Sequence, residues 1–87
     1  MDGHGEAKLK AEEIARRGRE IYERDIRSEE FDREHRGEFL VVDVTSGEHE
    51  LDPNEAEAFD RAEDKNPEGL FYLMRVGYRA AHRIGAR

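Results

Sequence analysis

Apolar residues in this chain gather in two short runs within an otherwise highly charged sequence. Residues 39–44 and 70–76 are apolar at nearly consecutive positions, so both faces of a pleated strand would be apolar in each run. Such strands are typical of sheets that are covered on both sides. We therefore expect residues 39–44 to form a central, covered strand and residues 70–76 to form a further strand that is also apolar on both faces. Residues 48–51 between them predict a short polar edge strand, whose acidic side chains discourage further pairing.

Before the first strand, residues 6–25 predict one long helix, because Ala, Glu, Lys and Arg dominate this segment. Small and apolar side chains recur there at intervals of three and four and define a narrow seam, formed by Ala11, Ile14, Gly18, Ile21 and Tyr22. The seam either packs on the chain's own sheet or pairs with a second copy or a partner protein. In the second case these five residues are a candidate interface, where the glycine would let another backbone approach closely.

Two helix starts are marked by capping residues. Ser28 is followed by acidic residues and predicts the N-cap of a short helix over residues 29–35. Asp52, Pro53 and Glu55 have the spacing of a capping box and predict another helix that runs to about residue 64. Both signals satisfy backbone N–H groups that a helix start leaves unpaired, so we place a helix boundary at each.

These elements assemble into an α+β fold. We expect a disordered terminus over residues 1–5, a helical arm over residues 6–36, and a small β-β-α-β domain over residues 37–87 with a basic C-terminal segment. Its three-stranded, antiparallel-type sheet should have the strand order 2-1-3. Residues 78–84 form either a short helix or an extended tail. One face of the sheet is covered by the predicted helix, and the other needs the arm or a second subunit, so we expect a homodimer.

The composition narrows the class of protein. The chain has 87 residues, enough for one domain, and it contains no cysteine, which excludes a disulfide framework and thiolate chemistry. It has no apolar run of about 18 residues and no signal-peptide pattern, so we expect a cytoplasmic protein without a membrane span. Charged residues make up 43% of the chain and hydrophobic residues 36%, which leaves a marginal core and also favours self-association.

Charge is unevenly distributed along the chain. Residues 43–68 contain ten acids and two bases, whereas the last eighteen residues contain no acid. Those eighteen carry three candidate docking residues at intervals of four, Arg75, Arg79 and Arg83. Arg75 lies in a predicted strand, so only Arg79, Arg83 and Arg87 can share a helical stripe. The segment either neutralises the acidic helix of the same or a neighbouring chain, or it binds carboxylates or phosphates of a partner. The net charge of −7 argues against nucleic acid as the main partner.

No pattern in the sequence supports a catalytic or metal site. Asp43 stands beside a predicted three-residue hairpin loop, Thr-Ser-Gly at residues 45–47, and is expected to accept hydrogen bonds from the turn. His49 lies between two glutamates and has no second ligand at a fixed spacing. We therefore expect no metal, no cofactor and no catalytic residue. An enzyme would need a pocket built across a dimer interface from residues such as Asp43, His49 or His82.

The strand–hairpin–helix–strand stretch begins Gly-Glu-Phe-Leu-Val-Val-Asp-Val at residue 37 and ends Leu-Met-Arg-Val-Gly-Tyr at residue 78. It resembles a group of short uncharacterised bacterial proteins whose genes often lie beside a partner gene, in the manner of antitoxin-like or accessory proteins. The resemblance covers roughly residues 20–85 and brings no catalytic residues with it. It implies a bacterial origin and a protein partner.

These features together lead us to expect a small non-enzymatic accessory protein that acts by self-association and by docking a partner protein. Its candidate surfaces are the seam of the arm and the arginines near the C-terminus. The alternative is an antitoxin-like regulator that contacts nucleic acid through its arginine-rich C-terminus despite the acidic net charge. A binding assay across salt concentrations separates the two, because phosphate contacts give a steep salt dependence.

Overall fold

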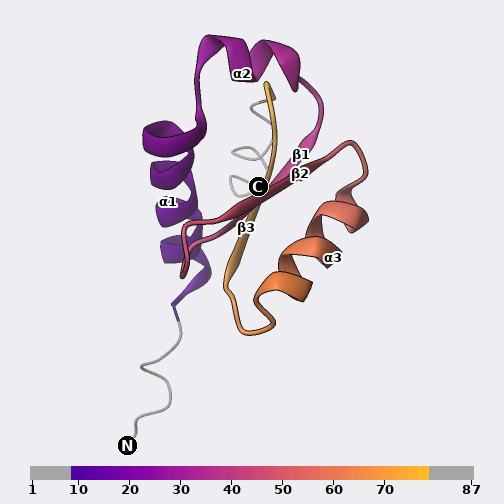
Figure 1. The fold of residues 1–87 in the computed structure, drawn as a ribbon. Coiled ribbons are helices and arrows are strands. Elements are labelled where there is room, and N and C mark those ends of the chain that lie inside the picture. Colours follow the sequence, from indigo (N-terminus) through magenta and orange to yellow (C-terminus); the bar gives the residue numbers. More distant parts are fainter. Residues whose placement is uncertain (1–8, 79–87) are drawn as a thin grey trace, which may run out of the picture.

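The computed structural model describes residues 9–78 and shows a three-stranded sheet with helices on both sides (Figure 1). In chain order the elements are α1 (Ala11–Ile21), the π-helix η2 (Tyr22–Ile26), α2 (Glu29–Glu34), β1 (Phe39–Asp43), β2 (His49–Asp52), α3 (Glu55–Lys65) and β3 (Phe71–Arg75). The predicted terminus at residues 1–5 lies outside the described residues, and so does all but the first residue of the segment 78–84.

The sheet has the order β2-β1-β3, and β1 pairs antiparallel with both neighbours. This confirms the α+β arrangement and the strand order 2-1-3 that the sequence predicts. Leu40 in β1 pairs with Leu51 on one side and with Met74 on the other. Because side chains alternate along a strand, successive residues of β1 supply opposite faces of the sheet.

Each face of β1 has its own apolar core. Leu40 and Val42 are fully buried on the face that meets the arm, in a cluster completed by Ile21, Tyr22, Val44, Tyr72 and Val76. Val41 is fully buried on the opposite face, against Ala58 and Ala62 of α3. The two-sided apolar pattern of this strand therefore reflects burial between two helical layers, as predicted.

The two helical layers cover different parts of the sheet. α3 packs on β1 and β2, whereas α1 packs on β3 and β1 from the other side, as Figure 1 shows. The sequence left open whether the arm or a second subunit covers this face of the sheet. In the structure, the arm of the same chain covers it. The covering of that face is therefore no longer a reason to expect a dimer.

The arm helix differs from its predicted bounds of residues 6–25. α1 begins at Ala11, and its continuation η2 has a wider π-helical turn, closed by a bond from the Arg27 N–H to the Tyr22 carbonyl at 2.7 Å. The Tyr22 hydroxyl donates to the carboxylate of Asp32 in α2, and Arg27 also binds Asp32. Burial and then this hydrogen bond raise the pKa of the Tyr22 phenol above its ordinary value. The sequence did not predict this turn, because apolar residues at intervals of three and four look the same in a regular α-helix and in a helix with one widened turn.

One of the two predicted helix caps is confirmed and the other is wrong. Ser28 accepts a hydrogen bond from the Phe31 N–H at 2.9 Å and caps α2. The N-cap of α3 is Asn54, whose side chain accepts from the Glu57 N–H at 3.0 Å. Asp52 is instead the last residue of β2, and its carboxylate accepts from the Asn54 N–H at 2.7 Å. Strand pairing thus overrides the local capping signal at Asp52.

Gly18 lets α1 approach β3 closely. A Cβ atom at this position would lie far inside van der Waals contact with the Tyr72 side chain, including its Cβ atom. Helix propensity alone would make Gly18→Ala stabilising by about 1 kcal/mol. We expect instead a loss of about 1–3 kcal/mol in the free energy of unfolding, because the helix must move away from the sheet. Chemical denaturation followed by circular dichroism measures the change.

Arg17→Ala is the matched control for this substitution, because Arg17 is the exposed neighbour of Gly18 on the same helix. Its effect should stay within about 0.5 kcal/mol. A Gly18→Ala variant that is as stable as the original chain, or more stable, would contradict the close packing of α1 on β3.

Candidate functional site

Asp43 at the end of β1 is buried, and hydrogen-bond donors enclose its carboxylate. One oxygen accepts from the N–H and the hydroxyl of Thr45, at 2.9 and 2.6 Å. The other accepts from the Ser46 hydroxyl at 3.0 Å and the Asn66 amide at 2.7 Å. A bond from the Asp43 N–H to the Glu48 carbonyl, at 2.9 Å, closes a hairpin loop of residues 44–47, which is one residue longer than predicted. The predicted turn bonds to Asp43 are confirmed, and Asn66 links them to the end of α3.

These donors keep the Asp43 carboxylate charged. Burial by itself would raise the pKa of this carboxyl, but the hydrogen bonds from Thr45, Asn66 and Ser46 outweigh it and lower the pKa below its ordinary value of 3.8. A general acid or base needs a pKa near the pH at which it works. Asp43 is therefore suited to holding the loop and the helix together.

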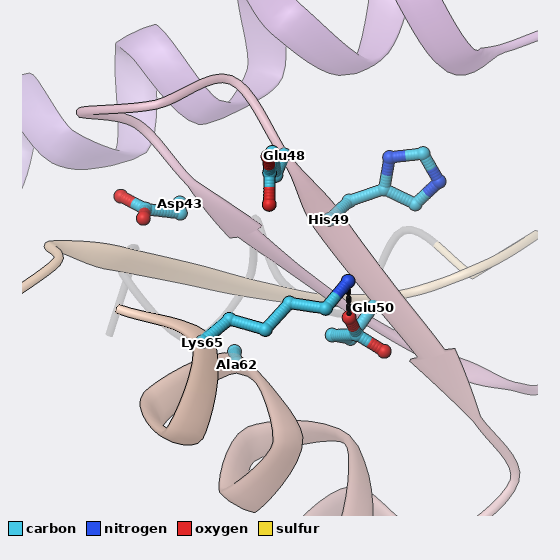
Figure 2. A pocket seen from close by; sticks show the side chains of 6 residues that line it. All are labelled: Asp43, Glu48, His49, Glu50, Ala62 and Lys65. Carbon is cyan, nitrogen blue, oxygen red and sulfur yellow. Dashed lines mark ion pairs between the residues drawn. The ribbon is translucent and has the colours of Figure 1, made fainter. Parts of the chain in front are cut away.

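A small hollow lies beside Asp43, between β2 and the end of α3 (Figure 2). Its lining consists of Asp43, Glu48, His49, Glu50, Ala62 and Lys65. The free volume is about 10 Å³, roughly the room that one water molecule needs. In Figure 2 the His49 ring points away from Asp43 and Lys65. The titratable groups therefore do not converge on a space that could hold a substrate.

Ion pairs join α3 to β2 next to this hollow. Lys65 binds Glu50 at 2.6 Å, and Arg61 binds both Glu50 and Asp52 at 3.1 Å. Arg61 also donates to the Leu51 carbonyl at 2.9 Å. The hydrogen bond from Lys65, and then that from Arg61, lower the pKa of Glu50 although partial burial opposes them. The acids on this face of β2 are thus neutralised by α3 of the same chain.

The described residues contain neither a metal-binding cluster nor a membrane-spanning helix. Within residues 9–78, no three His, Asp or Glu side chains come close enough to hold a metal ion. Nor is any helix in this range long and apolar enough to cross a membrane. His35 packs at the end of α2 against the ring of Phe31, with centroids 4.8 Å apart, far along the chain from His49 on β2.

The predicted interface seam of the arm faces the chain's own sheet. Gly18, Ile21 and Tyr22 are buried there, Ile14 packs partly buried against the same core, and Ala11 is exposed. This corrects the expectation of an intermolecular seam for the three buried residues, because the chain uses them in its own core. The regular spacing had revealed a buried helix face, but not which surface buries it.

Arg75 makes its contacts within the chain. Its Nε donates to the Gly37 carbonyl at 3.0 Å, and its guanidinium lies over the rings of Tyr78 and Phe39, at 4.4 and 5.1 Å from their centroids. These contacts hold Arg75 along the end of the sheet. The other two candidate docking residues, Arg79 and Arg83, lie outside the described residues.

The outer edge of β3 is a feature that the sequence analysis did not single out. Among residues 9–78, no strand pairs with this edge. The hydrogen bonds beside β3 that reach toward β1 involve Leu70 and Val76, so the even-numbered residues of this strand bond inward. The N–H and C=O groups of Phe71 and Leu73 and the N–H of Arg75 therefore point outward, where another strand can pair with them. The Arg75 carbonyl already accepts a hydrogen bond from the Tyr78 N–H at 3.2 Å.

Side chains at this edge are apolar on both faces. Phe71 and Leu73 lie on the α3 side. There α3 packs mainly on β1 and β2, and it reaches β3 through Phe59, whose ring centroid is 5.3 Å from that of Phe71. Tyr72 and Met74 lie on the α1 side, beside a groove of about 350 Å³ between η2 and β3. The sequence analysis did find apolar residues on both faces of this strand. That pattern is typical of central strands and could have indicated that the edge is paired in an assembly.

No protein-family model, no curated protein and no solved structure matches this chain. Its function therefore has to be inferred from the geometry of the described residues. That geometry offers a closed and satisfied cluster at Asp43, a neutralised acidic edge at β2, and an open apolar edge at β3. Both outer edges of the sheet have unpaired backbone groups among the described residues, but at β2 the Arg61 guanidinium occupies the Leu51 carbonyl. The edge of β3 is the more apolar of the two.

Asp43→Asn tests the role of the buried carboxylate. The substitution removes the charge and turns one acceptor into a donor that faces the Asn66 amide. We expect the free energy of unfolding at neutral pH to fall by about 1–3 kcal/mol. The folded-state pKa of Asp43 lies below the unfolded value near 3.8. Its contribution is therefore fully present above that value and is lost as the pH falls through the folded-state pKa. Denaturant unfolding at neutral pH and below about pH 4 measures both effects.

Asp60→Asn serves as the control, because Asp60 is exposed on α3. Its effect at neutral pH should remain within about 0.5 kcal/mol. If the stability difference between Asp43→Asn and the original chain stayed constant as the pH fell to about 2, the ionised carboxylate would not be its source.

Proposed function

We propose that this chain is a small non-enzymatic protein-binding protein that docks other protein chains by adding a strand to the outer edge of β3. The observation that carries the proposal is the row of outward N–H and C=O groups at Phe71 and Leu73, continued by the Arg75 N–H and bordered by apolar side chains on both faces. An extended segment that pairs with such an edge gains main-chain hydrogen bonds, and its alternate side chains gain apolar contacts.

The two edges of the sheet differ in the way that this proposal requires. Edge strands that stay unpaired are commonly short and charged. β2 has four residues and includes Glu50 and Asp52, whereas β3 has five residues and carries a charge at its last position, Arg75. The charged side chains of β2, which α3 already binds, disfavour burial beside another strand and leave β3 as the edge that favours docking.

A docking role also suits the thin apolar layer on the α3 side of β3. Phe59, Phe71 and Leu73 are each partly exposed, because α3 lies over the other two strands. A chain this small buries a modest fraction of its surface and gains stability when a partner covers more of it. A strand placed beside β3 would extend this layer across the edge.

The antitoxin-like alternative depends on the arginines near the C-terminus. Within the described residues, Arg75 already binds the Gly37 carbonyl and lies over the Tyr78 ring. The net charge of −7 also opposes the approach of phosphates. We therefore place protein docking ahead of nucleic-acid binding.

Leu73→Lys tests the docking edge, because it places a charge at the centre of β3 while its aliphatic stem can still cover the neighbouring apolar surface. A tagged original chain, mixed with an extract of the source organism, should retain a partner protein. Leu73→Lys should weaken the retention by at least about tenfold, since a buried charge disrupts the contact. The retained protein is then purified, and its affinity for both forms is measured by calorimetry.

Leu51→Lys is the matched control, because it makes the same change on the edge strand β2, where Leu51 is also partly buried. It should retain the partner as the original chain does. If the Leu73→Lys and Leu51→Lys variants are both folded by circular dichroism and bind equally, docking at β3 is contradicted.

A further inference from the structure

We infer that the chain's own β3 can occupy this edge, so that two copies pair antiparallel through β3 about a two-fold axis at Leu73. The inference rests on the proposed docking role of β3 and names a second copy of the chain as its partner. The sheet would then run continuously through both copies, as β2-β1-β3 from one followed by β3-β1-β2 from the other. The interface differs from the arm seam that the sequence suggested.

β3 has the side-chain pattern of a central strand but lies at an edge. Phe71 and Leu73 are on one face of the sheet, and Tyr72 and Met74 are on the other. A strand that docks here meets apolar neighbours on both faces, so it needs apolar residues at consecutive positions itself. The β3 strand of a second copy has that pattern. β2 does not, since Glu50 faces α3 and is bound there by Lys65.

The backbone restricts the register of the pair. Phe71, Leu73 and Arg75 have outward-facing backbone groups. An axis at Leu73 places Leu73 opposite its counterpart in the second copy and Phe71 opposite Arg75, so all three outward-facing residues pair with outward-facing residues. An axis at Tyr72 or Met74 would pair only two of the three. A shift of one residue would set these groups against residues that already bond to β1, and the hydrogen bonds would be lost.

Charge favours the same register. The charged residue of β3 is Arg75, at one end of the strand. Antiparallel pairing about Leu73 puts the two arginines at opposite ends of the strand pair, each opposite Phe71 of the other copy. Arginine beside an aromatic ring is a favourable contact, and Arg75 already lies over the rings of Phe39 and Tyr78. Parallel pairing would instead bring the two arginines side by side.

The groove on the α1 side provides room for side chains of the second copy. Its volume is about 350 Å³, and Tyr72, Met74 and Tyr78, which is 45% exposed, border it on the β3 side. The opposite side is mostly charged and consists of Arg19, Tyr22, Glu23, Arg27 and Asp32. In the two-fold arrangement, Met74 of one copy lies opposite Tyr72 of the other on this face. Tyr78, the exposed aromatic residue of this groove, would then lie beside the second copy.

A charge-exchange pair of variants tests the position of Leu73 on the axis. The original full chain should sediment as a dimer in analytical ultracentrifugation over a range of concentrations. Leu73→Lys and Leu73→Glu each place two like charges at the axis and should weaken dimerisation by at least about tenfold. A mixture of the two variants should form dimers again, because lysine then faces glutamate across the strands. Leu51→Lys, on the other edge, should remain dimeric.

An original chain that stays monomeric at every concentration would overturn the inference, and that result needs no variant to fold. A mixture that does not reassociate, or a Leu51→Lys variant that loses the dimer as fully as Leu73→Lys, would also overturn it. If the original chain is monomeric and partner capture still depends on Leu73, self-pairing fails while the docking function stands. If neither depends on Leu73, both proposals fail.

Discussion

The double burial of β1 determines how the rest of the chain is arranged. Leu40, Val41 and Val42 are fully buried in succession, so both faces of this strand must be covered by apolar side chains. α3 covers one face and the arm covers the other, which makes the sheet the middle of three layers. The two helices are offset toward different edge strands, and as a result the α3 side of β3 is thinly covered.

Polar contacts close one side of the molecule and leave the other open. Asp43 binds the hairpin loop and Asn66, and Arg61 and Lys65 of α3 bind the acids of β2. These contacts neutralise the β2 edge and tie it to α3. At the outer edge of β3, the described residues show no corresponding pairing, and Arg75 is drawn to the end of the sheet. This asymmetry is the physical basis on which we propose docking at β3.

Much of the fold was predictable because it follows from local patterns. The two-sided apolar runs predicted the strands β1 and β3, of which β1 is buried on both faces. Ser28 and Asp43 perform the roles that their neighbours in sequence suggest. The cap at Asp52 was not predictable from local signals, because that residue also ends a strand. The spacing of apolar residues on the arm shows that one helix face is buried, but it does not show what buries it. In the structure, Gly18 on that face packs against Tyr72 of the same chain. The open edge of β3 depends on the offset of two helices, which no local pattern records.

The central claim is that β3 is an edge strand within one chain and a central strand in an assembly. Amide hydrogen exchange along β3, measured by NMR, tests this most directly. The N–H groups of Tyr72 and Met74 face β1 and should be protected at every protein concentration. The N–H of Leu73 points outward and should become protected only as the concentration rises. Exchange at Leu73 that stays fast at all concentrations, or protection that does not change with concentration, would contradict the claim.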